Sequence, residues 1–187
     1  MKLSLMRTLL AYVEDRPGVL NRVTSLFRRR GYNIESLTVG RTERPGVSRM
    51  TVVMDADDDA AQRLEANLYK LVNVLWVKDV TEHATVVRDL ALIKVRADAS
   101  LRSSIMQLCD VFRARVVDVA PDAMIVEITG TQDKVDGLLE VLRPFGVIEM
   151  VRTGVIAMTR GVQEEPVLRD SERPPSSASS DRESAAA

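Results

Sequence analysis

The chain is poor in the residues that build disulfides and metal centres. Its 187 residues include one cysteine, Cys109, and one histidine, His83. These counts exclude an intrachain disulfide, a multi-cysteine zinc site and a cysteine-ligated iron–sulfur cluster. Aromatic residues make up only 4%, and 26 Lys and Arg residues are balanced by 27 Asp and Glu residues. Nucleic-acid-binding proteins usually combine a basic excess with interleaved aromatics, so the composition argues against a nucleic-acid partner.

Long apolar runs are missing as well. No stretch approaches the roughly 18 residues of a membrane span. The first residues reach an acidic side chain, Glu14, without the small-residue cleavage site of a signal peptide. We therefore expect a soluble cytoplasmic protein that makes no membrane contact. Hydrophobic residues still make up 45% of the chain, which is enough for a substantial core.

Residues 161–187 differ in composition from the rest of the chain. They contain six Ser, three Pro and no aromatic residue, with three Arg against six acidic residues. Such a segment cannot bury enough apolar surface to offset the entropy lost on ordering. We expect a disordered tail that contributes nothing to the core.

The first 160 residues repeat one pattern of elements, β-α-β-β-α-β. Strands are expected at 8–14, 32–43, 47–55 and 72–80, and again at 89–97, 114–120, 124–130 and 145–158. Ser100 and Thr131 are expected to cap the two helices of the second pass. This order predicts two tandem ferredoxin-like α+β domains, residues 5–82 and 86–160, each with two helices on one face of a four-stranded antiparallel sheet. Because the strands are apolar on both faces, the open sheet faces should be covered by dimerisation or domain stacking.

The segment EDRPGVLNRV, residues 14–23, carries the strongest binding signal. Asp15 is expected to cap the following helix, with Pro17 in its first turn. Gly18 would let a ligand approach the free N–H groups of the helix start, which suits a carboxylate or a phosphate. The alternative, which a proline–glycine pair alone favours, is an ordinary capped helix start. A P-loop is excluded because no GK[ST] follows.

Other polar residues carry weaker signals. Asn33 and Ser36 stand at the start of an apolar strand and could hydrogen-bond a zwitterion, although Asn33 after Gly31 also suits a turn. The Asp residues at 55, 57, 58 and 59 could bind a cation but fit a charged helix start better. No nucleophile, base and orienting group come together, so the sequence predicts a binding module rather than an enzyme.

The run VEDRPGVLNRVTSLFRRRGYNIESLTVGRTERPGVSRMTVV, residues 13–53, resembles the N-terminal ACT domain of the acetolactate synthase (acetohydroxyacid synthase) small subunit. The part RGYNIESLTVG is characteristic of that family rather than of ACT domains in general. The resemblance continues through LYKLVNVLWVKDVT and through EITGTQDKVDGLLEVLRPFGVIEMVRTGVIAMTRG, and covers residues 5–161. The family often has Asn where this chain has Asp15.

The resemblance implies a regulatory subunit with no catalytic or metal-ligating residues and no cofactor of its own. Its partner would be the large catalytic subunit, which carries thiamine diphosphate, magnesium and FAD and converts two pyruvates to 2-acetolactate and CO2. The small subunit would raise that activity and confer feedback inhibition by valine or a related branched-chain amino acid. By the family pattern the effector lies between two ACT domains of a homodimer, which it contacts through Asp15, Pro17, Gly18, Val19 and Leu20 of one chain and Asn33, Ile34 and Ser36 of the other.

Three other functions remain to be weighed. An ACT-type amino-acid sensor without an enzyme partner would have the same fold and the same effector site. An RNA-binding RRM shares the order of elements, but its central strands need exposed aromatics, and SRMTVVMD and AMIVEITG contain none. An independent enzyme would form acetolactate without a second subunit.

Overall fold

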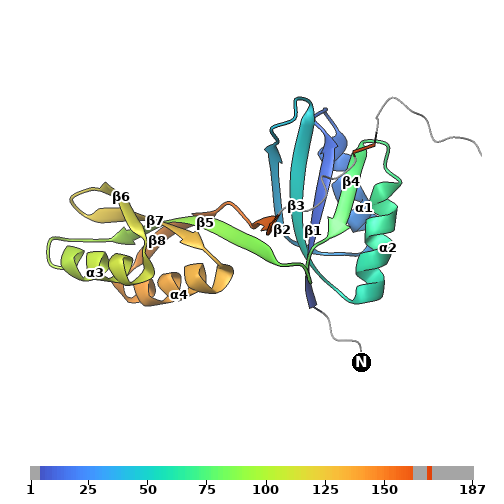
Figure 1. Cartoon of the computed structure of the whole chain (residues 1–187). Coiled ribbons are helices and arrows are strands. Elements are labelled where there is room, and N and C mark those ends of the chain that lie inside the picture. The colour runs from blue at the N-terminus through green and yellow to red at the C-terminus, as the bar shows by residue number, and fades with distance from the viewer. Residues whose placement is uncertain (1–4, 162–167, 170–187) are drawn as a thin grey trace, which may run out of the picture.

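The computed structural model describes residues 5–161 and 168–169, which form two domains connected by a long strand (Figure 1). The N-terminal domain consists of β1 (Leu5–Glu14), α1 (Val19–Arg30), β2 (Ile34–Arg41), β3 (Val47–Ala56), α2 (Asp58–Tyr69) and β4 (Val74–Asp79). The C-terminal domain consists of β5 (Thr85–Arg96), α3 (Arg102–Phe112), β6 (Arg115–Val119), β7 (Ala123–Gly130), α4 (Gln132–Leu142), a 3-10 turn (Arg143–Phe145), β8 (Val147–Arg152) and β9 (Ile156–Thr159). The predicted tandem βαββαβ order is confirmed, with β9 as an additional strand.

Both sheets are antiparallel and have the strand order of a ferredoxin-like domain, β2-β3-β1-β4 and β6-β7-β5-β8. Helices α1 and α2 cover one face of the first sheet, and α3 and α4 cover one face of the second (Figure 1). Each interface contains a separate hydrophobic core of fully buried side chains, which are Leu9, Phe27, Met50, Met54, Leu64 and Leu68 in the first and Ile93, Ile105, Met124, Ile128, Leu138 and Leu142 in the second. Cys109 packs in the second core, and its burial raises the pKa of the thiol.

Helix α1 starts differently from the sequence prediction. Its N-cap is Gly18, which has a left-handed conformation with a φ of 83°, and no side chain caps the helix. The prediction that Asp15 caps α1 with Pro17 in its first turn is wrong, because the turn at Pro17 and Gly18 precedes the helix. Gly31 ends the helix in a left-handed conformation with a φ of 71°.

The predicted cap of α3 is also wrong, whereas that of α4 is at the expected position. The N-cap of α3 is Leu101. The Asp98 carboxylate accepts hydrogen bonds from the backbone N–H groups of Ser100 (2.8 Å) and Leu101 (3.1 Å). The Ser100 hydroxyl and these backbone donors lower the pKa of Asp98. Thr131 is the N-cap of α4, and Asp57 caps α2 by accepting a hydrogen bond of 2.8 Å from the Ala60 N–H.

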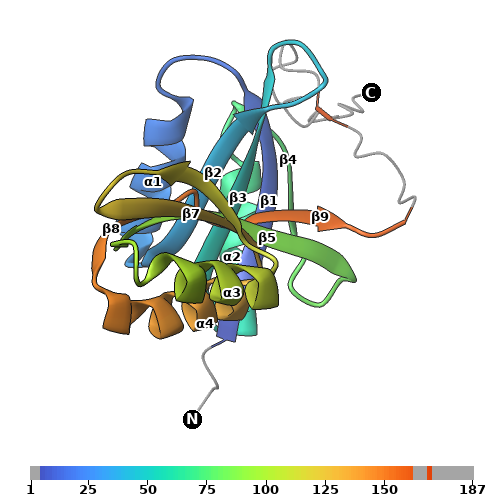
Figure 2. The same ribbon diagram turned by 90° about the vertical axis from the view of Figure 1, so that its left-hand side faces the viewer.

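The strand predicted at 145–158 is interrupted. The chain turns between Thr153 and Val155, where Gly154 has a φ of 87°. Strand β9 then leaves the C-terminal sheet and pairs with the first part of β5, residues 85–88. These two segments, the β5–β9 ribbon, lie across the outer face of the N-terminal sheet (Figure 2). There Leu10, Val80 and Ala157 form a third buried cluster with Trp76 and Val87. Domain stacking therefore covers part of the apolar outer face.

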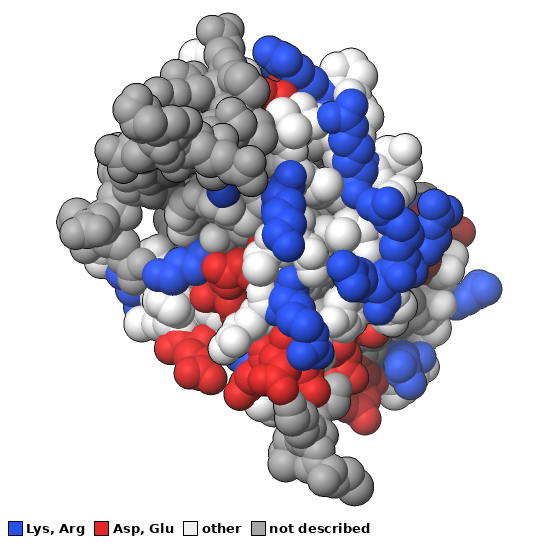
Figure 3. Space-filling view, turned by 90° about the vertical axis from the view of Figure 1, so that its right-hand side faces the viewer, with Lys and Arg blue, Asp and Glu red and all other residues white. Residues whose placement is uncertain are grey.

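The helical side of the N-terminal domain carries charges of both signs (Figure 3). Arginines 28–30 occupy the last turn of α1, and Asp58 and Asp59 occupy the first turn of α2. Both arrangements complement the helix dipoles, so they need no ligand to explain them. No helix in the described part of the chain is long and apolar enough to cross a membrane.

Most of the segment expected to be a disordered tail lies outside the described residues. Of its last 20 residues, the structure describes Leu168 and Arg169. The Arg169 N–H donates to the Leu75 carbonyl at 3.1 Å, and its guanidinium donates to the Tyr69 carbonyl at 2.6 Å. The same guanidinium lies 3.3 Å from the centroid of the Tyr69 ring. One residue of the segment therefore contacts the N-terminal domain.

Candidate functional site

The loop before α1 presents unpaired backbone donors. Because Gly18 turns the chain sharply, the helix begins at Val19, whose N–H donates to the Arg16 carbonyl at 3.4 Å. Among the described residues, the N–H groups of Leu20 and Asn21 have no hydrogen-bond acceptor. A Cβ at Gly18 would meet no atom within 4 Å, so the approach to these donors is open. Free donors at the positive end of a helix dipole favour an anion such as a carboxylate.

A network of side chains that sequence reasoning missed holds this loop in place. Glu14 is 6% exposed and accepts a hydrogen bond from the side-chain amide of Asn73, whose oxygen accepts one from Arg22 on α1. The Glu14 N–H also donates to the Asn73 carbonyl at 3.0 Å. Because Asn73 lies far from Glu14 in the sequence, no local pattern could have connected them. The network ties the end of β1 to α1 and to the start of β4.

The predicted residues of this loop differ in exposure. Asp15, Pro17, Gly18 and Leu20 are exposed, whereas Val19 is 4% exposed and packs in the core. Leu20 has the helical spacing of the buried residues Val23 and Phe27, yet it remains 46% exposed. An apolar contact with a ligand is therefore available from Leu20 and not from Val19.

The predicted residues at the start of β2 lie at the opposite end of the sheet. Ile34 pairs with Met54, whereas Arg41, at the end of β2, lies 3.4 Å from the Asp15 carboxylate. About seven residues of strand separate the two ends by roughly 20 Å. The exposed Asn33 donates a hydrogen bond to Glu35. Within one chain, the structure does not bring the two groups of predicted residues together.

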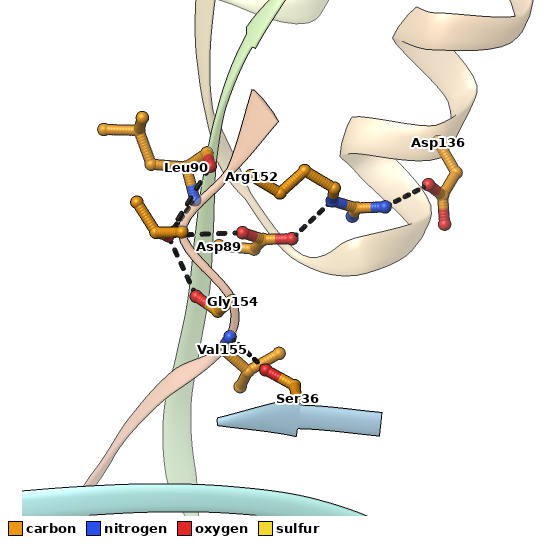
Figure 4. Close-up of polar contacts among 8 residues, drawn as sticks. Ser36, Asp89, Leu90, Asp136, Arg152, Gly154 and Val155 are labelled. Atoms are coloured by element: carbon orange, nitrogen blue, oxygen red, sulfur yellow. Dashed lines mark hydrogen bonds and ion pairs between the residues drawn. The ribbon is translucent and has the colours of Figure 1, made fainter. Parts of the chain in front are cut away.

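Ser36 connects the N-terminal sheet to the C-terminal domain (Figure 4). Its hydroxyl accepts a hydrogen bond of 2.8 Å from the backbone N–H of Val155, in the β8–β9 connection. A Cβ at Gly154 would lie 2.8 Å from the Ser36 Oγ and 3.1 Å from the Thr38 Oγ1. Both the positive φ and this close approach require glycine. Ser36 therefore contacts the second domain in addition to its place in the predicted site.

An ion pair between partly buried Arg152 and buried Asp89 holds the other side of the β8–β9 connection. Arg152 donates hydrogen bonds of 2.7 Å to Asp89, which is 3% exposed, and to Asp136 on α4 (Figure 4). Burial lowers the pKa of Arg152, but the bonds to these carboxylates outweigh it, and the net pKa is raised. The Thr153 N–H donates to the Leu90 carbonyl at 3.0 Å. The connection is therefore anchored to β5 and α4 on one side and to Ser36 on the other.

The described residues thus provide free backbone donors before α1 and a hydrogen bond between the two domains at Ser36. In the described residues, no three His, Cys, Asp or Glu side chains are placed to hold a metal ion. Two of the Asp residues considered as cation ligands have structural partners, since Asp57 caps α2 and Asp58 forms an ion pair with Arg7.

Comparison with known families assigns both domains. Residues 9–76 match the family model described as AHAS small subunit-like ACT domain. Residues 88–161 match the model described as small subunit of acetolactate synthase. The two matched segments correspond to the two sheets.

Individual relatives cover the same part of the chain. The probable acetolactate synthase small subunit of Methanothermobacter thermautotrophicus is 50% identical over 81% of this chain and 90% of that protein. The acetolactate synthase small subunit of Mycolicibacterium smegmatis is 48% identical over 82% and 91%. The crystal structure of the acetolactate synthase small subunit from Thermotoga maritima has a TM-score of 0.79 and 39% identity, and covers 85% of this chain and 99% of that one. With both domains matched in sequence and in structure, the chain belongs to the acetolactate synthase small subunit family.

Proposed function

We propose that this chain activates a large catalytic acetolactate synthase subunit and confers feedback inhibition by valine. That subunit would convert two pyruvates to 2-acetolactate and CO2 in branched-chain amino acid biosynthesis. In this proposal the large subunit would bind thiamine diphosphate, magnesium and FAD, and this chain would bind none of them. A cytoplasmic location stays a prediction. Membership of the family supports the regulatory role.

The open edge of β2 is the observation that best supports an effector site shared by two copies. In the described sheet β2 pairs only with β3, and an unpaired strand edge is a template for a second chain. If two copies pair their β2 strands about a twofold axis, the start of each strand lies beside the end of the other. The end of β2 contacts Asp15 through Arg41. Residues 33–36 of one copy would therefore reach the loop before α1 of the second copy.

The chemistry of such a pocket matches an apolar amino acid. The free N–H groups of Leu20 and Asn21 would bind the carboxylate, in front of Gly18. The Asp15 carboxylate or the Asn33 side-chain oxygen would accept hydrogen bonds from the ammonium group. Leu20 and Ile34 supply apolar surface for a branched side chain, as an amino-acid pocket requires.

Ser36 offers a route from this pocket to the C-terminal domain. A ligand near residues 33–36 would shift the start of β2, and the hydrogen bond from Val155 to Ser36 would carry that shift into the β8–β9 connection. Inhibition requires a ligand that binds two arrangements of the protein with different affinity. The position of the C-terminal domain relative to the first sheet is the arrangement that we expect valine to bias.

Reconstitution with the large subunit of the same organism tests the proposal. Acetolactate formation should rise to a plateau as this chain is added, and L-valine should then lower it. D-valine is the matched control, because it has the same groups but cannot place all three in the same pocket.

Two results would replace the proposal by an alternative. If calorimetry shows that the chain binds valine but reconstitution shows no activation of the large subunit, the chain is a free-standing sensor. If the purified chain alone forms acetolactate at a substantial rate, it is an enzyme in its own right.

A further inference from the structure

We propose that the groove between the N-terminal sheet and the β5–β9 ribbon is a second ligand site, which binds a small aliphatic carboxylate. The groove has a volume of about 440 Å³, within the range of small-molecule sites. The outer face of β2 and β3 forms one wall, and the ribbon forms the other. It is separate from the free N–H groups before α1, which belong to the proposed valine site.

Three guanidinium groups give the groove its positive charge. Arg41 and Arg49 belong to the sheet wall, and Arg88 belongs to the ribbon wall. Arg41 is the one with an acidic neighbour, Asp15. Arg49 donates to the Ala157 carbonyl at 2.6 Å, and Arg88 donates to the Val87 carbonyl at 2.7 Å. Among the described residues, neither of these two has a carboxylate partner.

Unsatisfied polar atoms also line or border the sheet wall. The Arg49 Nε and the Thr38 Oγ1 are buried, and neither has a hydrogen-bond partner in the described structure. Buried polar atoms are nearly always hydrogen-bonded, so an unpaired one indicates a missing partner. Both residues line the groove. The guanidinium groups of Arg49 and Arg88 donate hydrogen bonds only to backbone carbonyls of the described chain. An anion in the groove would give them a charged acceptor.

The ribbon wall is mostly apolar, and it favours a ligand with an aliphatic body. Val86, Ile156 and Met158 line it, and Ile156 and Met158 are 53% and 62% exposed. Exposed apolar side chains next to unpaired cations fit a molecule with an acidic head and an aliphatic body. Inorganic phosphate would leave this wall uncovered, and a neutral hydrocarbon would leave the guanidinium groups without an acceptor.

A second copy of the chain fits the groove less well than a small anion. In a twofold interface the same surface of both copies comes together. Pairing through the groove would therefore bring the arginines of one copy close to those of the other. Like charges placed at close range oppose association. An anionic ligand removes that repulsion.

Binding of hexanoate to the full-length chain tests the proposal, with 1-hexanol as the neutral control of equal chain length. Calorimetry should show saturable binding of hexanoate and none of hexanol. Arg88→Gln should weaken binding about tenfold or more, because it removes one charge-assisted hydrogen bond. Ile156→Glu should abolish binding by placing an anion in the groove. Both side chains are exposed, so both variants should fold. Arg29→Gln, an exposed arginine on α1, is the matched control and should bind like the wild type.

Further outcomes separate this site from its rivals. Equal binding by Arg88→Gln and the wild type would overturn the proposal, as would equal binding of hexanol. Loss of hexanoate binding in Gly18→Asp, but not in Arg88→Gln, would place the carboxylate before α1 and overturn it too. If Arg88→Gln instead changes the sedimentation equilibrium of the unliganded chain, the groove is an interface between copies and the proposal is wrong.

Discussion

Gly18 has two separate functions at the head of α1. Its φ of 83° lies where most L-residues are strained by about 1–2 kcal/mol, with Asn and Asp affected least. The empty space in front of it leaves the N–H groups of Leu20 and Asn21 accessible. A substitution therefore changes the stability of the turn and the access of a ligand, and an isosteric pair of variants separates the two effects.

Gly18→Asp and Gly18→Asn should lower stability similarly but differ in their response to valine. The two side chains have the same shape and tolerate the left-handed conformation similarly, so urea denaturation should give comparable losses of about 1 kcal/mol. Only Asp places a negative charge beside the expected carboxylate, a repulsion of up to about 4 kcal/mol at 4 Å in a surface-like dielectric. Valine inhibition of the reconstituted enzyme should be lost in Gly18→Asp and weakened less in Gly18→Asn. Equal valine curves for the two variants would remove the carboxylate from this loop.

Single residues show which parts of the site local sequence can predict. The proline–glycine pair located the loop correctly, because both residues favour a turn before a helix. The cap itself was misassigned at α1 and α3, since capping depends on the geometry of the preceding turn rather than on the nearest polar residue. Leu20 shares the helical spacing of the core residues, and only the structure shows that it is exposed.

At the scale of elements, the β8–β9 connection determines how the domains meet. Gly154 turns the chain out of the C-terminal sheet, and Val155 then donates to Ser36. Asp89 and Arg152 fix the C-terminal side of the same connection. A change at Gly154 therefore acts on the contact between the domains while leaving both cores intact.

Gly154→Ala should destabilise the protein more than Gly46→Ala. Gly46 has a φ of 76° and open space at its Cβ, so its variant measures the left-handed strain alone, about 1–2 kcal/mol. At Gly154 the methyl group would also lie 2.8 Å from the Ser36 Oγ, so the hydroxyl must rotate away from the Val155 N–H. Urea denaturation and valine titration of the reconstituted enzyme measure both effects. The valine response should weaken in Gly154→Ala alone, and an unchanged response there would disconnect Ser36 from regulation.

Hydrophobic periodicity predicted most elements within a few residues of their observed bounds. Strand β3 was expected at 47–55 and is observed at Val47–Ala56, for example. The break before β9 was missed because residues 145–158 are rich in strand-forming apolar residues on both sides of Gly154, and a glycine inside such a segment is also compatible with a bulge. The hydrogen bonds from Asn73 to Glu14 and from Val155 to Ser36 join distant segments, and local patterns contain no information about them.

At the scale of the whole molecule, two sheets share one ribbon. The ribbon buries Leu10 and Val80 on the outer face of the first sheet, while no described strand pairs with the outer edge of β2. The apolar outer face predicted for the first sheet is thus partly covered by the chain itself, and the open edge leaves a place for a second copy. Regulation by a ligand between copies would then act on the same sheet that carries the ribbon.

The segment after residue 161 provides the last prediction. Because β4 pairs only with β1 in the described sheet, its outer edge is open where Arg169 donates to Leu75. The stacking of the Arg169 guanidinium on Tyr69 adds a contact worth about 0.5–1 kcal/mol at an exposed site. The entropy of ordering the segment offsets part of this gain. A chain ending at Arg160 should therefore be less stable by about 1 kcal/mol.

Three variants distinguish the contact of Arg169 from a general effect of the tail. In urea denaturation, the full-length Arg169→Ala variant should have a lowered midpoint because it loses the guanidinium contacts with Tyr69, and a chain ending at residue 160 should be lowered at least as much because it also loses the backbone hydrogen bond to Leu75. A chain ending at residue 169 should match the wild type, because it keeps both hydrogen bonds and the stacked ring. Activation of the large subunit and the valine response should persist in all three, since neither Leu168 nor Arg169, the residues of this segment after Gly161 that the structure describes, belongs to a core. If the chain ending at residue 160 is as stable as the wild type, Arg169 contributes nothing to the fold. If the chain ending at residue 160 no longer confers the valine response, the segment has a regulatory function in addition to its contact with β4.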